Sequence, residues 1–190
     1  MNLTKVSYLA APALMGAYGV VRLMGGQHGP GFGWTFGHSL MLAGLVLFAW
    51  VIAGLRRLAP PGLAANALAA IGAVGLVATC VQFGIDIVVG LLSEDAAAKH
   101  HYSERIQGVP GLTPLVYTVV PVFFYVGVLG LLVLLATARA RIAPWWAPVL
   151  ILAGTATVAA DLDYIPESAV LFLLGLAPFA FQNRNVMTTG

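Results

Sequence analysis

The stretch Leu63–Leu92, LAANALAAIGAVGLVATCVQFGIDIVVGLL, decides the fold class of this chain. It carries a single charged side chain, Asp86, and is otherwise apolar or small. A bilayer core is crossed by about 20 consecutive apolar residues in helical conformation. The stretch is longer than that, so it predicts a membrane helix that tilts or projects beyond the bilayer.

The whole chain has the same character as this stretch. Of its 190 residues, 60% are hydrophobic and 8% are charged, and the mean hydropathy is +0.93. A soluble domain usually has about a quarter of charged residues, and a disordered chain combines high charge with few apolar residues. These values exclude both classes and predict a polytopic membrane protein.

Six apolar segments predict an all-α integral membrane bundle that forms a single membrane domain, residues 1–190. The predicted spans cover residues 6–24, 34–55, 63–92, 112–138, 144–160 and 165–181, with an outer polar segment at 93–111. Spans five and six are short for a bilayer, so a re-entrant hairpin in their place stays open. Because the first segment runs into Arg22 without an Ala-x-Ala site, we interpret it as a membrane helix and not as a cleavable signal.

Charge separates by side along the predicted spans. The N-terminus, two connections and the C-terminal tail hold only basic charges: Lys5, Arg56, Arg57, Arg139, Arg141 and Arg184. The other side holds all seven acidic residues and three basic ones, Arg22, Lys99 and Arg105. The positive-inside rule then places both termini in the cytoplasm. Abundant Ala, Gly and Arg are typical of GC-rich bacterial genes, so we expect a multi-pass protein of a bacterial inner membrane.

Asp86 is the most informative residue, because it lies about two turns inside the end of its span. A carboxylate at mid-membrane costs about 2.5–3.5 kcal/mol, so it must face the bundle interior or water. Steps of three and four place it on a face of small and polar residues that favours close helix packing: Gly72, Gly75, Thr79, Gln82, Asp86, Gly90 and Ser93. Asp86 is then either a proton acceptor, ligand anchor or ion site, or a structural partner of Arg22 or His38.

His38 lies at a depth that matches Asp86, one turn into the second span. A histidine oriented by a carboxylate makes a general base or a pH switch. The alternative is a core histidine that donates to a backbone carbonyl. Tyr18 and Arg22 form an i, i+4 pair in the outer half of the first span, where Arg22 either snorkels to the interface, neutralises Asp86 or binds an anionic head group.

Aromatic residues of the fourth span offer the walls of a cavity. Tyr117 and Tyr125 repeat at four-residue steps through Pro121, and they either pack in the core or line the same cavity as Asp86. Trp34 on the outer side and Trp145 on the inner side fit the aromatic belts of a membrane protein.

Cofactors and nucleic acid are not expected. The acidic turn 161–167 lacks the ligand order of a calcium loop, and His100, His101 and Glu104 lack the arrangement of a zinc site. His38 is the one histidine predicted inside a span, which disfavours a bis-histidine haem. The basic residues do not cluster on one face, as a nucleic-acid partner requires. We therefore expect no metal and no other cofactor.

These residues favour an integral membrane enzyme that performs acid/base chemistry on a lipid or isoprenoid-like substrate. Asp86 and His38 are the predicted catalytic residues. The predicted substrate-binding residues are Arg22, Tyr18, Gln82, Tyr117 and Tyr125. Two alternatives remain open: a small channel or proton-coupled transporter, and an accessory or sensor subunit of a membrane complex. The expected partner is a membrane lipid or an apolar small molecule, with a homo-oligomer as a further possibility.

Overall fold

The computed structural model of the chain describes residues 2–26, 29–139 and 142–182. Within these ranges the backbone forms helices joined by short connections, and it contains no strand. In chain order the elements are α1 (Leu3–Val21), η1 (Arg22–Gly26), α2 (Phe32–Leu58), α3 (Leu63–Leu92), α4 (Ala96–Gln107), η2 (Thr113–Thr118), α5 (Val119–Thr137), α6 (Trp146–Ala160), η3 (Leu162–Tyr164) and α7 (Ile165–Phe181).

Five helical stretches are long and apolar enough to cross a membrane and suggest a multi-pass membrane protein. They are Leu3–Gly25, Phe32–Leu58, Leu63–Leu92, Thr113–Thr137 and Leu162–Phe181. The apolar helix α6 is shorter, with 15 residues. At 1.5 Å per residue it extends about 22 Å, less than a hydrocarbon core of about 30 Å. The six predicted spans thus become five long helices and one short apolar helix.

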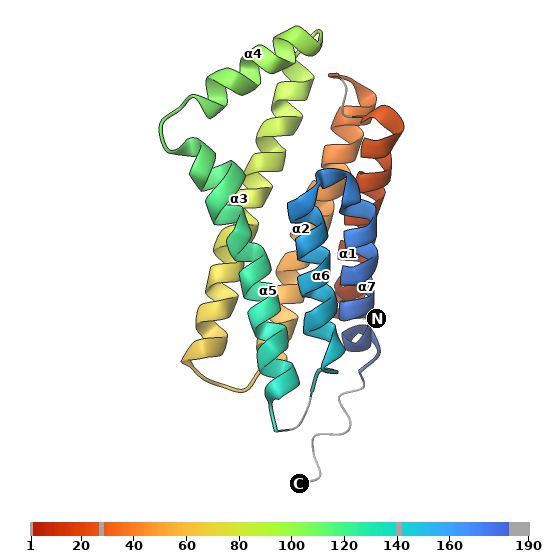
Figure 1. Cartoon of the computed structure of the whole chain (residues 1–190), viewed down its shortest axis with the longest axis vertical. Coiled ribbons are helices and arrows are strands. Elements are labelled where there is room, and N and C mark those ends of the chain that lie inside the picture. The colour runs from red at the N-terminus through yellow and green to blue at the C-terminus, as the bar shows by residue number, and fades with distance from the viewer. Residues whose placement is uncertain (1, 27–28, 140–141, 183–190) are drawn as a thin grey trace.

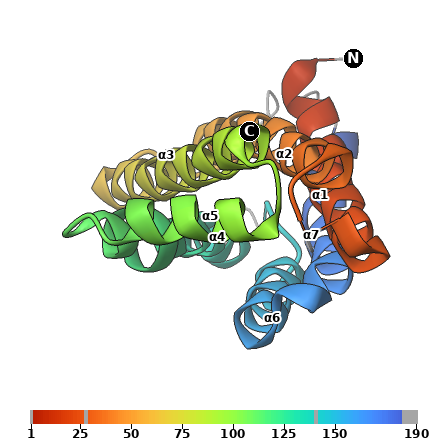
Figure 2. The ribbon, with the colours of Figure 1, turned by 90° about the horizontal axis from the view of Figure 1, so that it is seen from above.

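The helices of the bundle are neighbours in the order α5, α3, α2, α1, α7 and α6, and α5 also contacts α2 and α6 (Figures 1 and 2). Because α5, the first helix of this order, also contacts α6, the last, the six helices surround a shared core. Phe48 of α2 lies at its centre and packs edge-to-face with Phe124 of α5 and Phe172 of α7, at ring-centroid distances of 5.0 and 6.2 Å. Phe48 and Phe172 are fully buried.

Glycines let α3 and α5 approach closely, as the small-residue face of α3 predicts. A Cβ on Gly72 would lie 3.2 Å from the Cα of Gly127, and one on Gly75 would overlap the backbone of Phe124. Close backbone contact through small residues is the usual way in which membrane helices pack. Towards the end of α3, Gly90 of the same face instead packs against Trp34 of α2.

The outward faces of α3 and α5 are rich in exposed valines, which suits a surface covered by lipid chains. These valines are Val74, Val77, Val81 and Val88 on α3, and Val119, Val122, Val126 and Val133 on α5. Contiguous apolar surface of this extent is unusual on a soluble monomer. The pattern agrees with the membrane character of the sequence.

The polar segment 93–111 forms α4, which lies across one end of the bundle (Figures 1 and 2). Asp95 caps this helix, because its carboxylate accepts a hydrogen bond from the backbone N–H of Ala98. None of the residues of α4 is buried. We call this the α4 end; η1 and η3 belong to it as well.

The opposite end, which we call the basic end, holds the start of α1 and the end of α7 (Figure 1). Its described charged residues are Lys5, Arg56, Arg57 and Arg139, whereas Arg141 and Arg184 lie outside the described residues. All seven acidic residues belong to the α4 end or to the adjoining half of α3. The described basic residues of one end and the acidic residues of the other therefore give the bundle an asymmetric charge distribution along its long axis.

Candidate functional site

Asp86 and His38 meet between α3 and α2 in the half of the bundle next to α4. His38 Nε2 lies 4.0 Å from Asp86 Oδ2, and the two side chains are 7% and 20% exposed. The hydroxyl of Tyr117 in η2 donates to Asp86 Oδ1 over 3.4 Å. Three of the predicted site residues are thus brought together from three elements.

The backbone of α2 determines which nitrogen of His38 carries a proton. His38 Nδ1 lies 2.8 Å from the carbonyl oxygen of Trp34, one turn earlier in the helix. Because a carbonyl only accepts, Nδ1 is the donor of this bond. In the neutral ring Nε2 then presents a lone pair towards Asp86. At 4.0 Å no direct hydrogen bond joins Nε2 to the carboxyl, so the transfer of a proton between them requires a closer approach of the two side chains.

Tyr117 is directed by a local widening of the helix before α5. Pro121 has no N–H to offer to the carbonyl of Tyr117, and its ring crowds that carbonyl. The preceding residues Thr113–Thr118 form a π-helix, in which the N–H of Val119 bonds to the carbonyl of Pro114. Such π segments are frequent at functional sites. Here the π segment presents the Tyr117 hydroxyl to α3.

Aromatic rings enclose His38. The ring of Tyr18 lies 5.3 Å from it at an angle of 72°, and the ring of Phe83 lies 5.4 Å from it. Trp34 stacks on the imidazole with centroids 4.0 Å apart. An apolar wall of this kind keeps water away, so that charges inside it interact strongly.

Trp34 and Lys99 belong to this cluster, although the sequence analysis assigned neither to it. The indole Nε1 of Trp34 donates to the backbone carbonyl of Asp86 over 2.7 Å. The Nζ of Lys99, from α4, lies 3.8 Å from the centre of the same indole. Two spacings in the sequence could have placed Trp34 here. Trp34 lies one helical turn before His38, and Gly90, on which the indole packs, lies one turn after Asp86.

Arg22 takes a different partner from those expected. Its Nε lies 3.1 Å from Oδ1 of Asp163 in η3, with side chains 20% and 50% exposed. The pair ties the end of α1 to the turn between α6 and α7. Tyr18 lies beside Arg22, so Arg22 borders the cluster without contacting Asp86.

Tyr125 and Gln82 lie apart from the hydrogen bonds of the cluster. The ring of Tyr125 packs against Phe124 and Phe172, with centroids 5.0 and 6.2 Å away. It is two helical turns beyond Tyr117 and takes part in core packing. Gln82 is half-buried on α3, one turn before Asp86.

Metal ligands do not converge in the part of the chain that the structure describes. No group of three or more His, Cys, Asp or Glu side chains there has the geometry to hold an ion. On α4, His100 Nε2 lies 3.1 Å from Glu104 Oε1, but both side chains are more than half exposed. This pair is an i, i+4 contact on a solvated helix.

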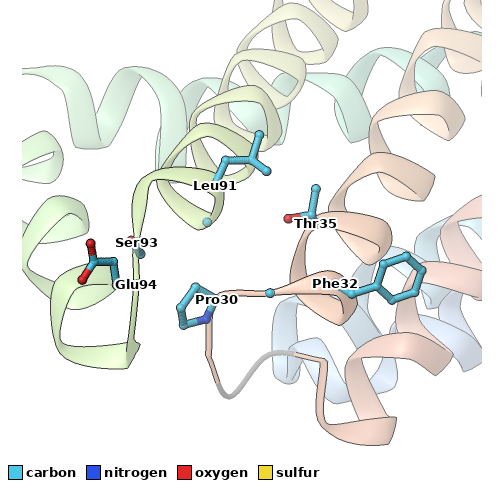
Figure 3. A pocket seen from close by; sticks show the side chains of 8 residues that line it. Pro30, Phe32, Thr35, Leu91, Ser93 and Glu94 are labelled. Atoms are coloured by element: carbon cyan, nitrogen blue, oxygen red, sulfur yellow. The ribbon is translucent and has the colours of Figure 1, made fainter.

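A cavity of about 460 Å³ opens beside the cluster, between the start of α2 and the end of α3 (Figure 3). It is lined by Pro30, Gly31, Phe32, Thr35, Gly90, Leu91, Ser93 and Glu94. Thr35 and Leu91 face each other across it, while Phe32 and Glu94 point away (Figure 3). Since Gly90 packs on Trp34, the cavity adjoins the indole that bonds to Asp86.

Comparison with known proteins leaves the chain without an assigned relative. No protein family, no curated protein and no solved structure matches it.

Proposed function

We propose that the protein is an integral membrane enzyme that performs acid/base chemistry on a lipid or isoprenoid-like substrate. The observation that carries this proposal is the convergence of Asp86, His38 and Tyr117 behind a wall of aromatic rings. Membrane-embedded ionisable residues are costly, and those that persist are commonly functional. Asp86 is the group that exchanges a proton with the substrate.

The three side chains have complementary roles in such a transfer. When the Asp86 carboxyl gives its proton to the substrate, the carboxylate left behind accepts the hydrogen bond of Tyr117. His38 Nε2 takes up a proton from water to form an imidazolium and passes that proton to the Asp86 carboxylate, which restores both the neutral imidazole and the carboxylic acid. General acid/base catalysis of this kind contributes about 10²–10⁴-fold to a rate.

The cavity beside Trp34 supports access for an amphiphilic molecule. Its neighbourhood is apolar and exposed, with Phe32 83% and Leu91 66% accessible. These side chains lie at the end of the membrane helices, where lipid chains and head groups meet. A substrate held there lies next to the indole that bonds to the backbone carbonyl of Asp86.

The distribution of charge supports an outer location for this site. The basic end fits the cytoplasmic face under the positive-inside rule, so we propose that α4 and the cavity face the other side of a bacterial inner membrane. A carrier would require ionisable groups that continue towards the basic end. Among the described residues, the buried polar side chains of that half are Ser7, which bonds to a backbone carbonyl, and Tyr8. This favours an enzyme over a carrier.

The test is turnover of purified protein on a panel of lipids and isoprenoids. We expect Asp86→Asn and His38→Gln to lower turnover about 100-fold or more without loss of folding. Glu104→Gln is the matched control, because it removes an exposed acid of the same end outside the cluster. Undiminished turnover in Asp86→Asn would falsify the proposal. Solute flux into liposomes that depends on Asp86 would establish the carrier instead.

A further inference from the structure

Trp34 contacts both members of the proposed proton-transfer pair. Its carbonyl accepts the hydrogen bond of His38 Nδ1 at 2.8 Å, and its ring stacks on the imidazole at 4.0 Å. The two contacts hold the plane of the imidazole as well as its tautomer. The orientation of Nε2 towards Asp86 therefore depends on Trp34.

The indole of Trp34 also joins α2 to α3 at the level of Asp86. Nε1 donates to the carbonyl oxygen of Asp86 over 2.7 Å, and the ring fills the space that the absent side chain of Gly90 leaves. The backbone of Asp86 is thereby attached to the helix that carries His38. The two side chains lie 4.0 Å apart beside this attachment.

Lys99 approaches the same indole from α4. Its Nζ lies 3.8 Å from the ring centre, whereas His38 lies one turn deeper in α2. Burial lowers the pKa of Lys99, and the negative charge of Asp86 opposes this change. Lys99 is thus partly removed from water although none of the residues of its helix is fully buried.

We propose that Trp34 is a positioning residue whose indole sets the spacing of His38 and Asp86, and that Lys99 of α4 holds this indole in place. The proposal rests on the proposed function, because it concerns the same proton-transfer pair. A cation over an indole is worth about 0.5–2 kcal/mol, enough to bias one side-chain orientation. The polar outer helix would in this way control the geometry of the buried pair.

Other groups also act on the pair, and the experiment must separate them from Trp34. Tyr18 and Arg22 face His38 from α1 and η1, and Tyr117 faces Asp86 from η2. These residues stay unchanged in every variant below. Differences between variants then report on Trp34 and Lys99.

The experiment measures the coupling of His38 to Asp86 by ¹⁵N NMR of the full chain in lipid nanodiscs. The coupling is the change in the titration midpoint of His38 that Asp86→Asn causes. For an imidazole about 4 Å from a carboxylate we expect a change on the order of one pH unit. Trp34→Phe and Lys99→Met should each reduce that change to less than half, while Lys99→Arg, which keeps a cation over the ring, should retain it. Trp145→Phe and Lys5→Met, at the basic end, are the matched controls and should leave it intact.

Each outcome decides the proposal. A coupling in Trp34→Phe as large as in the unaltered chain overturns the role of Trp34, and so does an absence of coupling in the unaltered chain. Should Trp34→Phe fail to fold, the comparison of Lys99→Met with Lys99→Arg on the surface helix decides, and equal coupling in both overturns it. Turnover is not measured here, so a failed lipid assay contradicts the proposed function and leaves this result standing.

Discussion

Two buried tyrosines of α1 differ in the surroundings of their hydroxyl groups, and they lie in opposite halves of the bundle. Tyr18, in the half next to α4, lies beside Arg22 and packs edge-to-face on His38. Tyr8, in the half next to the basic end, is 2% exposed and packs on Phe179. Its hydroxyl points at Gly54 and has no hydrogen-bond partner among the residues described.

The contrast separates an apolar scaffold from the candidate site. The half with Tyr8 is held by apolar packing, in which even a tyrosine hydroxyl is buried without a partner. The half with Tyr18 gathers a carboxylate, an imidazole, an indole and an ammonium group around one point. Substitutions in the first half should change stability, and substitutions in the second should change protonation and activity.

The largest effect on stability is expected in the scaffold, from Phe48→Ala. Phe48 is fully buried between Phe124 and Phe172, so its truncation leaves a cavity between three helices. We expect a loss of about 3–5 kcal/mol, measured by denaturant unfolding in mixed micelles. Val133→Ala, on the exposed face of α5, is the control and should change stability little. A loss for Phe48→Ala no larger than that of the control would contradict the assigned core.

The same substitution at the two tyrosines should act with opposite sign. Tyr8→Phe removes an unpartnered buried hydroxyl and should raise the free energy of unfolding by about 1 kcal/mol. Tyr18→Phe removes a hydroxyl beside a guanidinium and should lower it by about 1 kcal/mol. Equal changes in the same direction would show that the two halves do not differ in this respect.

A titration of Lys99 sharpens the description of the α4 end. The chain has two lysines, Lys5 and Lys99, so NMR of ¹³C-dimethylated protein resolves them readily. Because burial lowers the pKa of Lys99, its midpoint should lie below the ordinary lysine value of 10.5. Asp86→Asn removes the charge that favours the ammonium form, so the midpoint should fall further, by about half a pH unit. A rise in that variant would refute the closeness of Lys99 to Asp86.

The smallest effect is expected from the ion pair between Arg22 and Asp163. Both partners are accessible to solvent, and such pairs contribute about 0–1 kcal/mol. Asp163→Asn should therefore change the free energy of unfolding by less than about 1 kcal/mol, with a smaller change at high salt. A loss of several kcal/mol would assign the α6–α7 turn to the scaffold instead of the surface.

Sequence periodicity predicted the parts of the molecule that depend on one helix at a time. The predicted span 63–92 coincides with α3, and the steps of three and four in its small residues identify the face that packs on α5. Depth within the spans was enough to expect His38 near Asp86. The short length of the segment that became α6 was visible as well, but the sixth span was wrongly expected to be short, because η3 extends it to the 20-residue stretch Leu162–Phe181.

Sequence periodicity could not predict contacts that depend on how the segments between the membrane helices fold against the bundle. Lys99 reaches Trp34 because α4 lies across the end of the bundle, which no periodicity specifies. Arg22 pairs with Asp163, which is 141 residues away in the chain. Tyr125 shares a sequence repeat with Tyr117, but the π segment that precedes α5 separates their surroundings.

We propose that Asp86 and His38, whose side chains lie 4.0 Å apart in the half of the bundle next to α4, exchange a proton as one unit. Infrared difference spectroscopy of the purified protein during a pH titration tests it directly. We expect a carboxyl C=O band that disappears in Asp86→Asn and changes its frequency and titration midpoint in His38→Gln, with Glu104→Gln as an unchanged control. An Asp86 band that is indifferent to His38→Gln would contradict the claim.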